Sequence, residues 1–328
     1  MASDVYFIDE AAKKRFKRQK ILSNVFVYTF LTICALFMLL PFYYMVITAF
    51  KTPKLVSDEV LGNSLQLFPK FSNLTGLNLK IVLFGYDSSQ NFANGNFLRY
   101  FANTILVALC STAITTVTCV LSAFAFARLE FKGKNLLFAL LLSTMMIPGE
   151  LMIITNFTTV QIFGWTGVGA NEKVYLALIL THSISVFYIY YLRQTFQQIP
   201  NELYLAAKVD GYGVFKYLWK VMIPIAMPTI VTIIILSVMG SWNAYMWPAM
   251  VTKGNDSMKM VANGLMDMFQ SFAGGDFSEK LRLDGYNPIA LDGLRLAGSL
   301  IVTTPLFIFF LCFRKFIMRG VSRSGIKG

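Results

Sequence analysis

The chain has 328 residues, of which 56% are hydrophobic and only 14% are charged, and its mean hydropathy is +0.59. Soluble domains carry about 25% charged residues, so this composition excludes a soluble globular protein and a disordered chain. The net charge of +12 does not indicate nucleic-acid binding, because the basic residues flank apolar segments long enough to cross a hydrocarbon core of about 30 Å.

Six apolar segments predict an all-α membrane protein with six transmembrane helices. Each segment has the length of a membrane-spanning helix, in which the backbone groups are hydrogen-bonded without water. The first segment follows a basic stretch but lacks a small-residue cleavage site, so we expect a retained span and not a signal peptide. The segments cover residues 22–45, 102–127, 136–157, 174–192, 222–248 and 294–313.

The positions of Lys and Arg predict the orientation of these spans. If the N-terminus is cytoplasmic, the cytoplasmic parts hold 18 of the 29 Lys and Arg residues and 6 of the 17 acids, which is the whole net charge. Both termini are therefore expected in the cytoplasm, with the basic run 13–20 near anionic lipid headgroups. The predicted cytoplasmic parts are residues 1–21, 128–135, 193–221 and 314–328.

The same boundaries predict the organisation of the chain. We expect a basic N-terminal segment (1–21), a first span (22–45), an extracytoplasmic loop (46–101), a core of five spans (102–316) and a cytoplasmic tail (317–328). Within the core, an outer loop is expected at 251–293. The four cysteines lie inside predicted spans at spacings unlike those of metal sites, so no metal is expected.

Glu150 follows Pro148 and Gly149 in the predicted third span. A carboxylate inside a membrane is costly unless it faces a cavity or a partner, so Glu150 is a candidate for a substrate pathway. The Pro and Gly before it predict a kink in the helix.

The longest predicted cytoplasmic loop, residues 193–221, has the pattern of a short helix. Pro200 and Asn201 mark its start, and Glu202 lies in the first turn, where the helix dipole favours an acid. Asp210 and Gly211 mark its end, because Gly tolerates the left-handed conformation found there.

Small side chains on this predicted helix leave room for a second protein. Leu203, Ala206 and Ala207 share one face, Phe215 begins a second amphipathic piece, and Pro224 marks the start of the fifth span. A short helix held outside the bilayer suits a soluble partner. The alternative is an amphipathic helix lying on the membrane surface, and these residues alone leave both open.

Aromatic and amide side chains gather near the end of the fifth predicted span, at Trp242, Asn243, Tyr245 and Trp247. Sugars are held by aromatic faces and hydrogen-bonding side chains, so this set is a candidate sugar pathway together with Glu150. The alternative is aromatic anchoring at the membrane interface combined with helix packing.

The run Leu205-Ala206-Ala207-Lys208-Val209-Asp210-Gly211 resembles the cytoplasmic signature of permease subunits of bacterial ATP-binding-cassette importers, which is Glu-Ala-Ala followed by three residues and Gly. More narrowly, the chain is similar to sugar-importer permeases of the maltose-permease type. Met146-Ile147-Pro148-Gly149 and the run from Ser241 to Pro248 fit that group in the expected order. One departure is Leu205, which stands in the place of the acid.

This resemblance implies an ATP-driven importer of a carbohydrate such as an oligosaccharide, located in the bacterial cell membrane. The implied partners are a second homologous permease, two cytoplasmic ATPase subunits that hold ATP and Mg²⁺, and an extracytoplasmic solute-binding protein. No cofactor is implied in this chain, and it has no Walker-type phosphate loop, so it is not expected to be an enzyme. The residues implied in ATPase coupling are Glu202, Ala206, Ala207, Asp210, Gly211, Phe215 and Pro224.

Two other classes of membrane protein are weighed beside this one. An ion-gradient-driven secondary transporter usually needs ion-coordinating acids at mid-membrane, whereas Glu150 is the one acid clearly inside a predicted span. A membrane-embedded enzyme needs a catalytic set, and no such motif occurs in the sequence.

Overall fold

The computed structural model describes residues 10–62, 64–84, 97–167, 169, 171–273 and 291–322. Residues 274–290 of the predicted outer loop and 323–328 of the predicted tail therefore lie outside the described residues. Within the described residues the chain is helical, with one isolated bridge between Lys51 and Leu74 as the extended pairing. The prediction of an all-α protein is confirmed.

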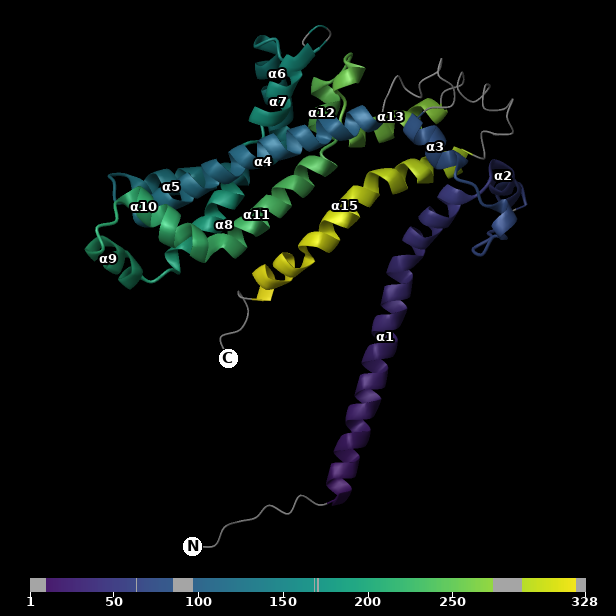
Figure 1. Cartoon of the computed structure of the whole chain (residues 1–328), viewed down its shortest axis with the longest axis horizontal. Coiled ribbons are helices and arrows are strands. Elements are labelled where there is room, and N and C mark those ends of the chain that lie inside the picture. The colour runs from purple at the N-terminus through teal and green to yellow at the C-terminus, as the bar shows by residue number, and fades with distance from the viewer. Residues whose placement is uncertain are drawn as a thin grey trace.

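The first long helix, α1 (Glu10–Phe50), stands apart from the other helices over most of its length (Figure 1). Its most apolar stretch has no buried residue. Only the end near Phe50 is packed, where Ala49 enters a core with residues of α3 (Leu77–Phe84) and α15 (Leu291–Ser322). The predicted first span thus lies inside a longer helix that packs against its own chain only near its C-terminal end.

The centre of the fold is a bundle of α4 (Phe97–Arg128), α8 (Val186–Gln197), α11 (Ile223–Asn243) and α15. Hydroxyl groups join α4 to α11, because Ser111 Oγ lies 3.2 Å from Ser241 Oγ and Thr112 Oγ1 donates to Ser237 Oγ at 3.0 Å. Such bonds between helices replace water for polar groups inside an apolar bundle.

Four helical segments are long and apolar enough to cross a membrane, among the residues that the structure describes. They are Arg15–Phe50, Phe97–Arg128, Val214–Asn243 and Leu291–Arg314, and they contain the predicted first, second and sixth spans and most of the fifth. The fifth ends at Asn243 and not at residue 248, because the chain turns there before the short helix α12 (Met246–Val251).

The predicted third span is not one continuous helix. It consists of α5 (Lys134–Ser143), a 3₁₀ turn (Thr144–Met146) and α6 (Gly149–Ile162), and the two arms meet at 98°. Pro148 explains the break, since a proline disfavours helical geometry at the residue before it. The expected kink is confirmed, and it bends the predicted span far more sharply than an ordinary helix kink.

The predicted fourth span is also interrupted. A 3₁₀ turn (Asn171–Lys173) leads into α7 (Val174–Leu180), and α8 begins only at Val186. Ser183 Oγ donates to the carbonyl of Ile179, and Ser185 Oγ accepts from Tyr188 N–H at the start of α8. Serine side chains that bond to nearby backbone groups compete with the helix ladder, which accounts for the break.

Between α1 and α4 the chain forms α2 (Pro53–Leu61), a 3₁₀ turn (Phe71–Asn73) and α3. A buried ion pair fixes α2 to the end of α1, with Lys51 Nζ 2.8 Å from Glu59 Oε1. Asn78 Nδ2 of α3 donates to the carbonyls of Ala49 and Lys51 at 3.1 and 2.9 Å. This part of the predicted loop 46–101 is therefore folded onto the helices.

After α12, a 3₁₀ turn (Asp256–Met258) leads into α13 (Val261–Ala273), which packs on α4. Asn103 of α4 holds the turn, because its Nδ2 donates to the carbonyls of Ser257 and Lys259 at 3.0 and 2.9 Å. Burial lowers the pKa of Lys259, but hydrogen bonds to Asp256 and Asp267 outweigh it and hold that pKa above its ordinary value. The ion pairs thus stay charged and join the turn to α13.

Candidate functional site

The predicted cytoplasmic loop contains the short helix α9 (Asn201–Val209), followed by α10 (Val214–Tyr217). Glu202 lies in the first turn of α9, as predicted. Gly211 has φ +75°, the left-handed conformation expected at this end, and its N–H donates to Lys208 O at 3.1 Å. Tyr212 N–H donates to Ala207 O at 2.8 Å, so the helix end is closed by its own backbone. We call residues 200–222 the coupling segment.

The inner side of the coupling segment belongs to the chain's own core. Ala207 is only 5% exposed and packs with Tyr217, Leu218 and side chains of α4, α8 and α11. The rings of Tyr204 and Tyr217 meet edge to face with centroids 5.0 Å apart, which joins α9 to α10. The segment is therefore fixed to the ends of three long helices.

Arg128, the last residue of α4, fastens the start of α9. Its guanidinium donates to the carbonyls of Phe196 and Ile199 and to the side-chain oxygen of Asn201. These acceptors lie at the end of α8 and the beginning of α9. One charged side chain thus joins three elements, and hydrogen bonds from a charged donor are stronger than neutral ones.

A π-helical turn (Leu218–Met222) connects α10 to α11, with Pro224 exposed at the start of α11. Leu218 and Met222 are fully buried, whereas Trp219 between them is exposed. The coupling segment is thus continuous with a membrane-spanning helix, and no flexible linker separates the two.

The outer side of the coupling segment is apolar and uncovered. Val209 is 87% exposed, and Leu205, Phe215 and Trp219 are exposed as well. Of the two alanines predicted to face a partner, only Ala206 is exposed. Ala207 is buried, because the helix turns this residue towards α10, and its part in ATPase coupling stays a prediction. We call Leu205, Ala206, Val209 and Phe215 the outer face.

A cavity of about 410 Å³ lies where the break in the fourth span meets α4, α11 and α12. Trp247 Nε1 donates to Ala177 O at 3.1 Å, and the Trp247 ring lies 5.4 Å from that of His182, so α12 is attached to this wall. The hydrogen-bonding side chains along the lining are Ser111, Thr115, Thr181, His182, Ser185, Tyr188, Ser237 and Ser241.

Of the residues predicted for the substrate pathway, Trp247 lines this cavity, whereas Trp242, Asn243, Tyr245 and Glu150 do not. Trp242 is buried and donates from Nε1 to Val302 O at 3.2 Å, so it joins α11 to α15, and its ring lies tilted against that of Phe101 of α4 with centroids 5.9 Å apart. It also borders a second, largely apolar pocket beside α15. Asn243 is exposed and donates to Met239 O, while Tyr245 and Glu150 are exposed elsewhere.

The sequence nevertheless contains a signal for the cavity. Ser111 and Thr115 are four residues apart on α4, and Ser237 and Ser241 are four residues apart on α11. This spacing places each pair on one helix face, so the sequence alone indicates a hydroxyl-bearing stripe on each of the two helices. Among the described residues, no group of three His, Cys, Asp or Glu side chains is placed to hold a metal ion.

The chain matches a family model and several known proteins of the same kind. The family model "Binding-protein-dependent transport system inner membrane component" matches residues 11–323. The chain is 26% identical to the arabinooligosaccharides transport system permease protein AraQ of Bacillus subtilis, over 77% of this chain and 83% of that protein. It is also 26% identical to the lactose transport system permease protein LacG of Rhizobium radiobacter, over 90% and 94% respectively.

The fold has a counterpart of known structure. A chain in the crystal structure of a bacterial ABC transporter involved in the import of the acidic polysaccharide alginate superposes with a TM-score of 0.71 at 19% identity. The match covers 91% of this chain and 97% of that one.

Proposed function

This chain belongs to the family of binding-protein-dependent transport system inner membrane components, and on that premise we propose that it is a carbohydrate-importing permease whose coupling segment receives the ATPase. It is a multi-pass inner-membrane subunit of an ATP-binding-cassette transporter and not an enzyme. Such systems work with an ATPase and a solute-binding protein. The observation that carries the proposal is the uncovered apolar outer face, held rigidly by Arg128.

The proposed topology has six crossings, formed by α1, α4, α5 with α6, α7 with α8, α11 and α15. Both termini and the loop 193–221, which holds most of the coupling segment, are then cytoplasmic, and the parts at 46–101 and 251–293 lie outside, in agreement with the distribution of Lys and Arg. The exposed apolar surface of α1 supports a second permease as a further subunit. Two ATPase subunits, which hold ATP and Mg²⁺, complete the proposed complex.

In the proposed coupling, ATP binding moves the ATPase pair and the coupling segment follows that motion. Because α10 continues through the π-helical turn into α11, a displacement of the outer face is transmitted to a membrane-spanning helix. The exposed members of the proposed contact are Glu202, Ala206, Asp210, Gly211 and Phe215, whereas Pro224 belongs to the transmitting helix. Leu205 gives this contact an apolar side chain in the place of the family's acid.

Substitutions at Ala206 and Ala207 distinguish an effect on ATPase docking from an effect on folding. We expect Ala206→Arg to reduce the copurifying ATPase by about tenfold or more, because it places an unpaired charge in an apolar contact, with no change in the thermal stability of the chain. Ala207→Arg should instead lower the thermal stability, because it forces a charged side chain into a packed core. Pull-down with tagged ATPase measures the docking, and a melting curve measures the thermal stability. Normal recovery of the ATPase with Ala206→Arg would contradict the proposal that the outer face is the docking surface.

For the substrate, we propose a carbohydrate that passes the hydroxyl-lined cavity beside α11. Serine and threonine hydroxyls donate and accept, as sugar hydroxyls do, and the Trp247 indole and His182 ring border the same space. The names of two relatives, for arabinooligosaccharides and lactose, agree with this class. Glu150, Trp242, Asn243 and Tyr245 have no part in this proposed site.

Removing cavity hydroxyls is expected to slow transport. Ser111→Ala and Ser241→Ala should each reduce the maximal uptake rate about fivefold, since a hydrogen bond contributes about 1 kcal/mol. The matched control is Thr232→Ala, which removes a hydroxyl from α11 that bonds to Pro228 O away from the cavity. The assay is uptake at saturating loaded binding protein; equal rates for all three variants would remove the cavity from the pathway.

Reconstitution tests the function as a whole. The purified complex in proteoliposomes should accumulate an arabino-oligosaccharide, lactose or another oligosaccharide only when ATP and loaded binding protein are supplied. Accumulation driven by a proton or sodium gradient, without ATP, would instead establish a secondary transporter.

A further inference from the structure

The loop between α2 and α3 exposes an unusual amount of apolar surface. Phe68 is 85% exposed and Phe71 is 90% exposed, and Leu65 and Leu61, the last residue of α2, are exposed as well. Large apolar side chains gathered in one exposed loop mark a surface that contacts a membrane or another protein. We call Leu61, Leu65, Phe68 and Phe71 the apolar loop patch.

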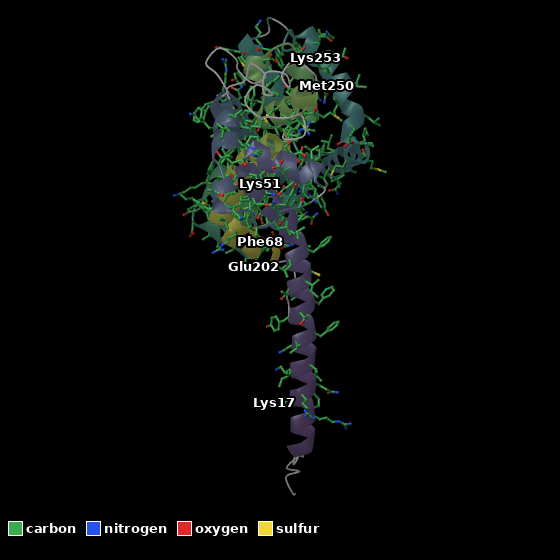
Figure 2. All side chains as sticks on the ribbon, turned by 90° about the vertical axis from the view of Figure 1, so that its right-hand side faces the viewer. Lys17, Lys51, Phe68, Glu202, Met250 and Lys253 are labelled. Carbon is green, nitrogen blue, oxygen red and sulfur yellow. The ribbon has the colours of Figure 1, made fainter. Side chains whose placement is uncertain are left out.

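The loop turns back along α1 and does not project away from it. Tyr43 Oη donates to Leu67 O at 2.6 Å, and the rings of Tyr43 and Phe68 have centroids 5.9 Å apart. Tyr43 precedes the end of α1 at Phe50 by seven residues, or about 10 Å of helix. Figure 2 shows Phe68 displaced from Lys51 towards Lys17, along the direction of α1.

Phe68 therefore lies level with a residue of a membrane-spanning segment, because Tyr43 falls within Arg15–Phe50. A lipid-exposed loop cannot enter the hydrocarbon core without leaving backbone groups unpaired, so its depth is limited to the interface. Aromatic side chains are enriched at this depth. Lys70, between the two phenylalanines, is exposed and suits the lipid phosphates.

Two contacts hold the loop in this position. The Glu59 carboxylate bonds to Lys51 Nζ and also accepts from Gln66 N–H at 2.9 Å, so the buried ion pair fixes where the loop descends. The Tyr43 hydroxyl holds the loop against α1 at Leu67. The patch is thus rigidly attached to α1 and continuous with the apolar surface of that helix.

We propose that the apolar loop patch is an anchor that rests in the headgroup region of the bilayer and sets the position of the end of α1. The partner that covers the apolar loop patch in this proposal is the lipid of the bilayer surface. Assignment to the outer leaflet rests on the orientation in the proposed function, whereas contact with lipid does not.

Spin labels on the assembled complex in proteoliposomes test this anchor. After Cys34, Cys110, Cys119 and Cys312 are replaced by Ser, a nitroxide is placed in Phe68→Cys, in Phe71→Cys and in the control Lys54→Cys, an exposed position on α2. Accessibility to oxygen, which concentrates in lipid, is compared with accessibility to a water-soluble nickel chelate. We expect the oxygen-to-nickel ratio to be several-fold higher at 68 and 71 than at 54.

Two results would overturn the proposal. Equal ratios at all three positions would mean that the patch faces water. Labels at 68 and 71 that are immobile and shielded from both reagents would mean that a protein subunit covers it. Phe71→Cys guards against a disturbed loop, because the ring contact with Tyr43 is made by Phe68. The experiment measures the depth of the labels in the bilayer and not transport, so its outcome is independent of whether the proposed function is correct.

Discussion

Replacing Gly211 with aspartate is expected to reduce uptake to background while the chain still inserts into the membrane. Gly211 lies at the exposed end of α9 with φ +75°, a conformation that Asp adopts at a cost of about 1–2 kcal/mol. A Cβ at this position meets no atom within 4 Å, so the side chain fits the chain itself. The loss is expected at the surface offered to the ATPase, where the added carboxylate stands next to Asp210.

The matched control is Gly211→Asn, which has the same size and the same backbone strain without the charge. We expect intermediate uptake for this variant, and both variants should reach the membrane in normal amounts. The measurement is substrate uptake in whole cells, normalised to the amount of chain in purified membranes. Full uptake by Gly211→Asp would remove the coupling role of this helix end.

The second large effect is expected at Arg128. Arg128→Ala removes the guanidinium bonds to two backbone carbonyls and to the Asn201 side chain. Hydrogen bonds from a charged group contribute about 1.5–3 kcal/mol each, so the start of α9 loses its polar attachment to α4, while the packing of Ala207 remains. We expect uptake to fall by more than tenfold, with ATP hydrolysis that no longer responds to loaded binding protein.

A single-bond control shows whether this attachment is the cause. Asn201→Ala removes one of the three acceptors and leaves the two carbonyl bonds of Arg128, so its effect on uptake should be several-fold smaller. Steady-state ATPase assays on reconstituted complex, with and without loaded binding protein, measure the coupling. Normal stimulation in Arg128→Ala would mean that the position of α9 does not depend on this residue.

Local signals were sufficient to predict the coupling helix. Pro200 before α9, the acid in its first turn and Gly211 after it act within a few residues of the chain, and the observed bounds Asn201–Val209 follow them. Which side of that helix faces inward was not predictable in the same way. Ala206 and Ala207 are neighbours with similar chemistry, and only the packing of Tyr217 and α4 decides that Ala207 is buried.

The substrate-pathway residues likewise depend on tertiary packing that the local sequence does not predict, here between residues far apart in the chain. Trp242 carries the chemistry of a sugar contact, yet its indole bonds to Val302, 60 residues further along the chain. The cavity depends on Ser111 meeting Ser241 across 130 residues. Helix-face periodicity indicates each stripe alone, but the pairing of the two stripes arises only from the tertiary arrangement of α4 and α11.

Native mass spectrometry of the complex, purified in mild detergent from its own membrane, tests the central claim most directly. The proposed assembly predicts a particle with one copy of this chain, one different permease and two copies of an ATPase. It also predicts that the Ala206→Arg complex loses the ATPase while the two permeases stay together. A chain that is isolated alone or as a homodimer, and still transports in liposomes without ATP, would contradict the account.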